Sequence, residues 1–321
     1  MRNTPNFGDE AARLPDSMDD LLGLSYHITH QQRETAPEWF APMLLVTSPL
    51  SPSITDTASR AKNSTTLNQR SALKFSIEET STIVDACKRQ SYSVTSAWHA
   101  ALALAFYKHR SRRESSTSME LPVDQNQGLA TFTTVDMRRF FPSSFDPRES
   151  AMACYHTALP VVLPIQPGLD PEKEGDLNLI FAGMAAKMQK FFAFGKTFKD
   201  GSNITQERSK AWPPYIEMMR DAILSCDETQ SAPLLSSFGL LENFIHRSFG
   251  DIGCDKPEIE IIDVWLGDTM TSATSFWSVQ TWRDRLEISV TYNEGYFAKR
   301  EMVHILEHIR AILLSSVSFR E

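Results

Sequence analysis

The stretch FWSVQTWRDRLEISVTYN, from Phe276 to Asn293, predicts an antiparallel β-hairpin. Aromatic and β-branched residues alternate with polar ones on both sides of Arg283 and Asp284, as in two strands joined by a tight turn. We therefore expect strands near 275–282 and 285–292. One face of the hairpin should be buried and the other should meet water or a functional site. The second strand has this apolar face: Leu286, Ile288, Val290 and Tyr292.

The residues that follow the hairpin predict a covering helix near 298–315. Gly295 ends the second strand, and the chain then becomes helical in its periodicity. Apolar residues recur at the i, i+3, i+4 and i+7 spacing of a core-facing stripe. A hairpin with a helix packed on it forms one layer of an α+β fold. The stripe consists of Met302, Ile305, Leu306, Ile309, Ile312 and Leu313.

Residues 71–321 are predicted to form one domain with a mixed β-sheet covered by helices. Further strands are expected near 129–137 and 158–165, where Pro160 and Pro164 place the second strand at an edge or a bend. A strand with a glycine break at Gly239 is expected within 234–245. Further helices are expected near 77–89, 96–109, 178–193 and 207–224.

Local signals fix the first two of these helices. Ser76 and Glu79 have the spacing of a capping box, in which each residue satisfies a free amide of the other. The second helix has Ser93 or Thr95 as its cap and is apolar nearly all round, so it belongs in the interior. The charged, serine-rich residues 110–118 that follow are expected to form a loop.

Residues 1–70 are predicted to be an irregular crossover or linker segment that packs less regularly than the rest. Their candidate helix at Met18 to Leu24 is short, and a Ser/Thr-rich run occupies 55–66. Such composition is typical of connecting chain. Four prolines interrupt the segment: Pro37, Pro42, Pro49 and Pro52.

Charge and hydropathy exclude several classes of partner. The net charge of −8 argues against nucleic acid and anionic membrane surfaces, which an acidic chain does not attract. No apolar run approaches the ~20 residues that span a bilayer, and the first residues lack the apolar core of a secretory signal. We therefore expect a cytoplasmic protein. Four separated cysteines are expected to be reduced thiols, and a zinc site is improbable: Cys87, Cys154, Cys226 and Cys254.

The histidines offer no established catalytic pattern. Only His30 has a carboxylate four residues on, Glu34, and chance produces such pairs often. His156 precedes a predicted edge strand and is a second weak candidate for a cleft. His99 lies in an apolar helix, where a core histidine bonded to a backbone carbonyl is the default. His304 and His308 have the i, i+4 spacing of metal ligands but no third ligand nearby, so we favour a partly solvated helix face and predict no metal.

Asp136 and Arg138 stand at the end of the strand near 129–137. Two interpretations are open. They could bind substrate, or they could form a structural ion pair that fixes the strand. We favour the structural role.

Taken together, these motifs resemble the C-terminal lobe of condensation-like acyltransferases, which have the chloramphenicol-acetyltransferase fold. The run VTSAWHAA from Val94 to Ala101 resembles the opening of that lobe, and TVDMRR from Thr134 to Arg139 is similar to the strand that follows there. The run from Leu286 to Asn293 is similar to the closing strand. The most similar group is that of fungal trichothecene 15-O-acetyltransferases, which share runs like Leu14 to Asp20 and Thr291 to Glu294.

The resemblance implies one lobe of a two-lobed enzyme. The family's general base is the second histidine of an HHxxxDG motif in the N-terminal lobe, and the present sequence contains no such motif. No catalytic residue is therefore carried over. The resemblance does imply a substrate-binding surface beside the acyl-donor tunnel and at the face that meets the other lobe. The implied residues are Ser236, Ser237, Gly239, Trp277 and Tyr292.

Three functional hypotheses remain open at this point. The first is an acyl-CoA-dependent O-acyltransferase of fungal secondary metabolism, with no bound cofactor and with acetyl-CoA or another acyl-CoA as co-substrate. Its other substrate would be a small-molecule alcohol such as a sesquiterpenoid of the mycotoxin type. The second is an inactive, truncated or binding lobe that associates with itself or with a separate N-terminal lobe. The third, a condensation-type fragment using a carrier-bound thioester, is the weakest because no Gly-x-Asp-Ser pattern is present.

Overall fold

The computed structural model describes residues 14–23, 30–44, 46, 48–54, 67–117, 127–146, 153–165, 170, 173–193, 232–250 and 259–316. The chain divides into two compact units. The smaller unit comprises Met1–Trp39, Thr134–Leu159 and Gly195–Leu224. The larger unit comprises Phe40–Thr133, Pro160–Phe194 and Ser225–Glu321. The helix expected at 207–224 lies outside the described residues.

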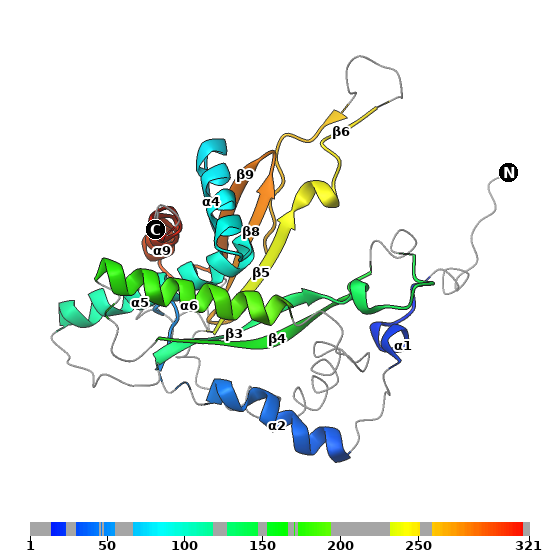
Figure 1. Ribbon diagram of the computed structural model, residues 1–321, viewed down its shortest axis with the longest axis horizontal. Coiled ribbons are helices and arrows are strands. Elements are labelled where there is room, and N and C mark those ends of the chain that lie inside the picture. Colours follow the sequence, from blue (N-terminus) through cyan, green and yellow to red (C-terminus); the bar gives the residue numbers. More distant parts are fainter. Residues whose placement is uncertain are drawn as a thin grey trace. The chain divides into compact units, whose positions relative to one another are not determined.

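A mixed sheet of seven strands is the main feature of the described chain, as the sequence predicts (Figure 1). Its order is β1-β3-β5-β8-β9-β2, and β4 pairs with β3. The pairs β1/β3, β3/β5 and β5/β8 are parallel, whereas β8/β9 and β2/β9 are antiparallel. The strands are β1 (Ser48–Pro49), β2 (Asn68–Lys74), β3 (Gln127–Asp136), β4 (His156–Pro164), β5 (Ala232–Leu240), β8 (Thr274–Trp282) and β9 (Arg285–Asn293).

The strand β4 contains both prolines that the sequence places at an edge or a bend. Its pairing with β3 is antiparallel, because Ile165 N–H donates to the Gln127 carbonyl and Met137 N–H donates to the Tyr155 carbonyl. Gly128 of β3 permits this approach. A Cβ at that position would lie 2.9 Å from the Leu163 carbonyl oxygen, closer than side chains tolerate.

The described part of the larger unit contains the helices α4 (Ile77–Arg89), α5 (Val94–Thr117), α6 (Glu174–Ala193) and α9 (Lys299–Ser316). The capping box at α4 is present, with Ser76 N–H donating to Glu79 and Glu79 N–H donating to Ser76 Oγ. Ser93 caps α5, since Ser96 N–H donates to its Oγ. The remaining elements are short or belong wholly or partly to the smaller unit: α1 (Met18–Leu22), α2 (His30–Leu44), η2 (Arg138–Phe140), η3 (Leu241–Asn243), β6 (Ser248–Phe249) and β7 (Ile259–Glu260).

The structure differs from the sequence predictions at two helix boundaries and within the segment 1–70. The loop expected at 110–118 is wrong, because α5 continues to Thr117. Lysine and arginine are good helix formers, and the charged residues give the end of the helix a surface that tolerates water. The helix α6 begins at Glu174 rather than near 178. The segment 1–70, expected to be irregular, contains the 15-residue α2. The proposed domain division at residue 70 stays a prediction.

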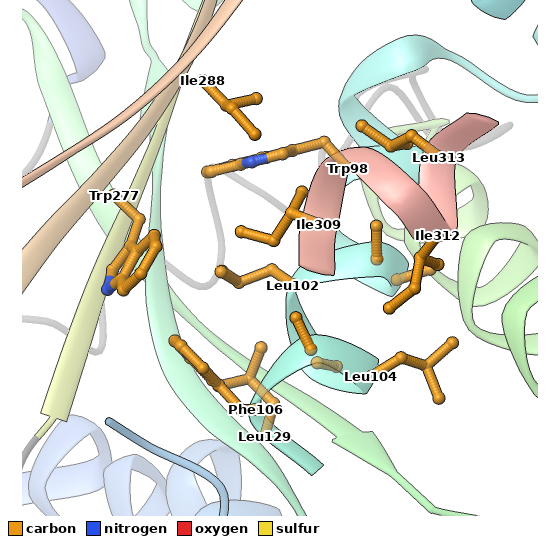
Figure 2. Packing of buried hydrophobic residues seen from close by; sticks show 14 of the residues in the cluster. Trp98, Leu102, Leu104, Phe106, Leu129, Trp277, Ile288, Ile309, Ile312 and Leu313 are labelled. Carbon is orange, nitrogen blue, oxygen red and sulfur yellow. The ribbon is translucent and has the colours of Figure 1, made fainter. Parts of the chain in front are cut away.

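The helix α5 forms the centre of the hydrophobic core. Every side chain from Ala97 to Phe106 has 0% of its surface exposed, so this part of the helix is enclosed on all sides. Phe106 meets Trp277 of β8 edge to face, with ring centroids 5.2 Å apart. Figure 2 shows side chains of α5 between those of the β8–β9 hairpin and those of α9, including Trp98, Leu102, Ile288 and Ile309.

The predicted hairpin is confirmed in register and in its turn. Trp282 pairs with Arg285 and Phe276 with Thr291, which leaves Arg283 and Asp284 as the two turn residues. Their φ angles are 50° and 61°. Positive φ at both positions is characteristic of a type I′ turn, whose twist matches that of the flanking strands.

This geometry predicts how substitutions at Asp284 change stability. Valine is strongly disfavoured at positive φ and glycine is not, so Asp284→Val should be about 1–2 kcal/mol less stable than Asp284→Gly. Both variants lose the same exposed carboxylate, and each therefore controls for the loss of charge in the other. Urea unfolding of the two proteins measures the difference. Equal midpoints would contradict the left-handed turn.

Candidate functional site

The second face of the hairpin is covered rather than wet, which corrects the expectation from the sequence. Residues 261–271, here called the crossing segment, lie along the polar side of β8 and β9. Polar side chains of the sheet bond to its backbone. Gln280 Nε2 donates to the Val264 carbonyl (2.9 Å), and Asn293 Nδ2 donates to the Met270 carbonyl (3.2 Å). As a result every residue from Leu286 to Asn293 is buried.

Further bonds extend this contact along the whole crossing segment. Arg70 Nε donates to the Leu266 carbonyl (3.0 Å), and Trp282 Nε1 donates to the Ile262 carbonyl (3.3 Å). Asn68 Oδ1 accepts from the backbone N–H of Met270 (2.6 Å). Most of these bonds use main-chain carbonyls as acceptors, so the sheet satisfies backbone groups that would otherwise be buried without partners.

Glu287 is the charged centre of this covered face. Its side chain is 5% exposed and accepts hydrogen bonds from the Arg70 guanidinium and from Gln280 Nε2 (3.2 Å). Lys74 Nζ lies 3.5 Å from Glu287 and 2.6 Å from Asp263 of the crossing segment. Two cations thus face two carboxylates, and the cluster is neutral in sum. A buried carboxylate compensated in this way serves as a structural anchor.

A pocket of about 200 Å³ lies between the crossing segment and the sheet. Apolar walls and charged groups both line it, and Gln280 Oε1 has no hydrogen-bond partner among the described residues. The pocket has the polarity to hold a small hydrogen-bonding molecule, but neither a hydroxyl or thiol nucleophile nor a histidine lines it. The lining residues are Lys74, Ile262, Asp263, Val264, Gln280, Trp282, Arg283, Arg285 and Glu287.

The predicted residues Ser236, Ser237 and Gly239 lie on the central strand β5. Gly239 has φ of 65° and marks a register shift against β8, a bulge that glycine permits. Just before the bulge, Ser237 Oγ lies 2.7 Å from Thr95 Oγ1 at the start of α5. Ser236 is buried. The structure therefore joins the bulged strand to the N-terminus of the buried helix through two hydroxyl groups.

His99 lies one turn beyond Thr95 and is a satisfied core residue, as the sequence predicts. Its Nδ1 lies 2.8 Å from the Thr95 carbonyl, which can only accept, so Nδ1 carries the proton. Its Nε2 then accepts from the Thr133 hydroxyl at 3.2 Å. Complete burial lowers the pKa of His99 to about 4. The ring is therefore neutral at pH 7, and both of its nitrogens are occupied.

Trp277 and Tyr292, which the resemblance assigns to a substrate surface, lie in the hydrophobic core. Both are 0% exposed. Trp277 Nε1 donates to Ser275 Oγ (2.9 Å), and the Tyr292 hydroxyl lies 3.4 Å from Ser71 Oγ. Neither side chain presents a surface to a ligand. The alternation that made them conspicuous reflects packing against α5 and α9.

Within the smaller unit, Asp136 and Arg138 form an ion pair. Arg138 donates to Asp136 Oδ1 through its backbone N–H (3.1 Å) and through Nη1 (3.0 Å). Its Nη2 donates to the Ala153 carbonyl (2.7 Å), and its guanidinium lies over the Tyr155 ring. These contacts join the residues after β3 to those before β4, an arrangement that suits the structural role. Whether the pair also touches substrate stays untested.

The two weak catalytic candidates also belong to the smaller unit and remain predictions. His30 Nδ1 lies 3.4 Å from Glu34, and both side chains are largely exposed, at 87% and 66%. His156 is exposed, with Nδ1 3.1 Å from Cys154 Sγ. Each histidine has a partner close to it in the sequence. Both pairs are open to water, whereas an acyl-transfer site must exclude water.

The described parts of the chain contain neither a metal-binding cluster nor a membrane-spanning helix. No group of three or more histidine, cysteine, aspartate or glutamate side chains is placed to hold a metal ion there. In the same residues, no helix combines the length and apolar character needed to cross a bilayer.

The sequence analysis did not identify the charged cluster under the crossing segment. Glu287 alternates with Ser289, Thr291 and Asn293 on one strand face, which the sequence predicts to meet water or a functional site. The missed signal was the neighbouring segment, where Val264, Leu266 and Met270 precede the hairpin closely enough to fold over it. Arg70 and Lys74 come from more than 180 residues away, and no local pattern connects them to Glu287.

Comparisons with known proteins agree with this architecture. No family model matches the chain. The chain is 21% identical over 246 residues to the azaphilone biosynthesis cluster protein M of Aspergillus terreus, covering 74% of this chain and 51% of that protein. It is 24% identical over 252 residues to the O-acetyltransferase pigM of Monascus ruber, covering 77% and 42%. The chain thus spans about half the length of the curated relatives it matches.

A solved structure gives the fold more directly. The trichothecene 15-O-acetyltransferase TRI3 of Fusarium sporotrichioides superposes with a TM-score of 0.73 at 16% identity, covering 98% of this chain and 58% of that one. The resemblance drawn from the sequence is thus confirmed for the fold. The chain has the condensation-like fold, and its sequence is similar to that of a fungal O-acetyltransferase.

The buried charge at Glu287 predicts a large effect on stability. Glu287→Gln leaves the Arg70 guanidinium without its anionic partner in a covered site, which should destabilise the protein by about 3 kcal/mol. The matched control is Glu294→Gln, an exposed residue directly after the same strand, where a change within about 0.5 kcal/mol is expected. Chemical denaturation of both variants measures this. Equal effects would show that Glu287 is not the charge that holds the crossing segment.

Proposed function

We propose that the chain is the C-terminal lobe of an acyl-CoA-dependent O-acyltransferase, most specifically an O-acetyltransferase that acts on a hydroxyl group of a fungal secondary metabolite. The observation that carries the proposal is the superposition of nearly the whole chain on about half of a trichothecene 15-O-acetyltransferase. Sequence similarity to an O-acetyltransferase of Monascus ruber and to an azaphilone biosynthesis cluster protein supports the same chemistry.

In this reaction a general base removes the proton of the acceptor hydroxyl. The alkoxide oxygen attacks the thioester carbonyl of the acyl-CoA, the C–S bond breaks, and coenzyme A leaves as a thiol after it takes up the proton. The acceptor becomes an ester. Water must be excluded, since it would compete for the same carbonyl.

The described histidines support the assignment of the base to the other lobe of the fold. His99 is buried, and both of its ring nitrogens are bonded. His30 and His156 are exposed and have one neighbour each. The HHxxxDG motif of the family is absent from this sequence. We propose that this lobe provides walls and positioning, and that a lobe carrying the motif provides proton transfer.

The part of this lobe nearest to function is proposed to be the bulged end of β5. Thr95, at the start of α5, bonds to Ser237, two residues before the left-handed Gly239. The chain beyond Gly239 leads to η3 and to the pair β6–β7, where several large apolar side chains are exposed. This combination suits a surface that another lobe or an acyl donor covers.

An alternative function is a non-catalytic binding or assembly lobe. The observation in its favour is that the buried His99 has both ring nitrogens bonded to Thr95 and Thr133, whereas His30 and His156 are exposed. The coding sequence upstream of Met1 can distinguish the two functions. An in-frame HHxxxDG there favours the enzyme.

The activity test compares residues 1–321 with a chain that also contains that motif. The isolated 1–321 should transfer no acetyl group from acetyl-CoA to a panel of terpenoid and polyketide alcohols. Loss of the general base alone should lower the rate of acetyl transfer by about 10²–10⁴-fold. The longer chain should transfer acetyl, and alanine at the second histidine of the motif should abolish this. Acetyl transfer by pure 1–321 that His30→Ala abolishes would overturn the assignment.

The exposed apolar side chains predict association. Phe244 is 73% exposed and Ile262 78%, and Leu240, Phe249, Ile259 and Trp265 are also exposed. We expect concentration-dependent self-association of 1–321 in sedimentation, together with binding of a hydrophobic dye. The double variant Phe244→Ser/Ile262→Ser should reduce both. The control is Leu179→Ser on α6, a 62% exposed leucine elsewhere on the chain. A monomeric wild-type chain that binds no dye would contradict the prediction.

A further inference from the structure

One polar cluster outside the proposed site has an unusual arrangement of donors and acceptors. Arg112, near the end of α5, directs a single nitrogen at two histidines of α9. Its Nη1 lies 3.1 Å from His304 Nε2 and 2.8 Å from His308 Nε2. The two imidazole rings, one helical turn apart, have centroids 4.2 Å apart.

The chemistry of these groups fixes their protonation. A guanidinium only donates hydrogen bonds, so each Nε2 must accept with its lone pair. Both imidazoles are therefore neutral and carry their proton on Nδ1. An imidazolium would place an N–H and a positive charge against Arg112. The contact exists in the neutral form of the two histidines and is lost when either ring is protonated.

The charges around the cluster favour this neutral form. Lys108 and His109 of α5 lie near His308, as does Arg112, and His109 Nε2 lies 3.4 Å from Ser53 Oγ. On α9, the Glu307 carboxylate lies 3.7 Å from His304 Nδ1. Burial, and then the neighbouring positive groups, lower the pKa of His308 to about 4. Among the described residues, His308 Nδ1 is buried without a hydrogen-bond partner.

We propose that Arg112, His304 and His308 form an acid-released clamp, in which protonation of an imidazole expels the arginine and frees the last turns of α5 from α9. This clamp is a property of the lobe itself and holds whatever reaction the protein catalyses. It also accounts for the helical continuation of α5 through residues that the sequence predicted to be a loop.

The direction of the effect follows from proton linkage. In the opened form the His308 pKa returns to its ordinary 6.5, so the opened form binds more protons than the closed form between pH 6.5 and about 4. The clamp is therefore fully stable above pH 6.5 and weakens as the pH falls below it. From pH 7 to pH 5, one imidazole with these values increases the opening equilibrium about 20-fold.

Hydrogen exchange of the purified chain tests this. After correction for intrinsic rates, amides of residues 108–117 should open about 20-fold more at pH 5 than at pH 7. The double variant His304→Gln/His308→Gln keeps acceptors for Arg112 and removes the titration, so its opening should not change with pH. Amides of residues 97–106 report any wider opening that His99 causes and serve as the internal reference. Equal pH dependence in the wild type and the double variant would overturn the proposal.

Nuclear magnetic resonance of the wild-type histidines gives a second measurement that needs no variant to fold. At pH 7 the ¹⁵N shifts of His304 and His308 should show the Nδ1–H tautomer in both rings. An Nε2–H tautomer, or an imidazolium, would exclude the clamp. Arg112→Met should raise the pH at which His308 titrates, because it removes a neighbouring positive charge.

Discussion

The enclosure of one helix is the constraint on which the structure depends. From Ala97 to Phe106, no side chain of α5 is exposed to water, so this part of the helix requires neighbours on every side, nearly all of them apolar. The β8–β9 hairpin provides one wall, and α6 and α9 provide others. Figure 2 shows how Trp98, Leu102 and Phe106 use successive turns of the helix to reach these walls. The register of the hairpin follows, because a slip of one residue would turn Trp277 and Ile288 away from α5.

The two faces of the same hairpin are buried by different kinds of interaction. On the helix side, large apolar side chains remove surface from water. On the other side, Glu287, Gln280 and Asn293 are enclosed because each finds a charged or polar partner. Burying the second face without these partners would cost about 1–3 kcal/mol for each unsatisfied group. The crossing segment is therefore bound by complementarity of donors and acceptors more than by apolar area.

Local patterns in the sequence were sufficient to predict most of the fold, but they predicted little of the candidate site. The hairpin, the capping box at Ser76 and the stripe on α9 are set by residues within a few positions of one another, and all three were predicted. The end of α5 was missed because Arg112 is held by histidines almost 200 residues away. Glu287 was misread for the same reason, since Arg70 and Lys74 come from a distant strand. Trp277 and Tyr292, which the resemblance assigns to a substrate surface, are fully buried, and burial depends on residues that are distant in the sequence.

The crossing segment has a consequence for how such a lobe diverges among related proteins. The sheet holds it through main-chain carbonyls at Ile262, Val264, Leu266 and Met270, groups that every amino acid possesses. Replacement of the side chains along the segment leaves these bonds in place as long as the backbone keeps its path. The side chains of Ile262 and Trp265 are largely exposed, although Ile262 lines the pocket and the Trp265 ring lies beside the Arg70 guanidinium. The exposed side chains of the segment can therefore change during evolution while its backbone hydrogen bonds to the sheet stay in place.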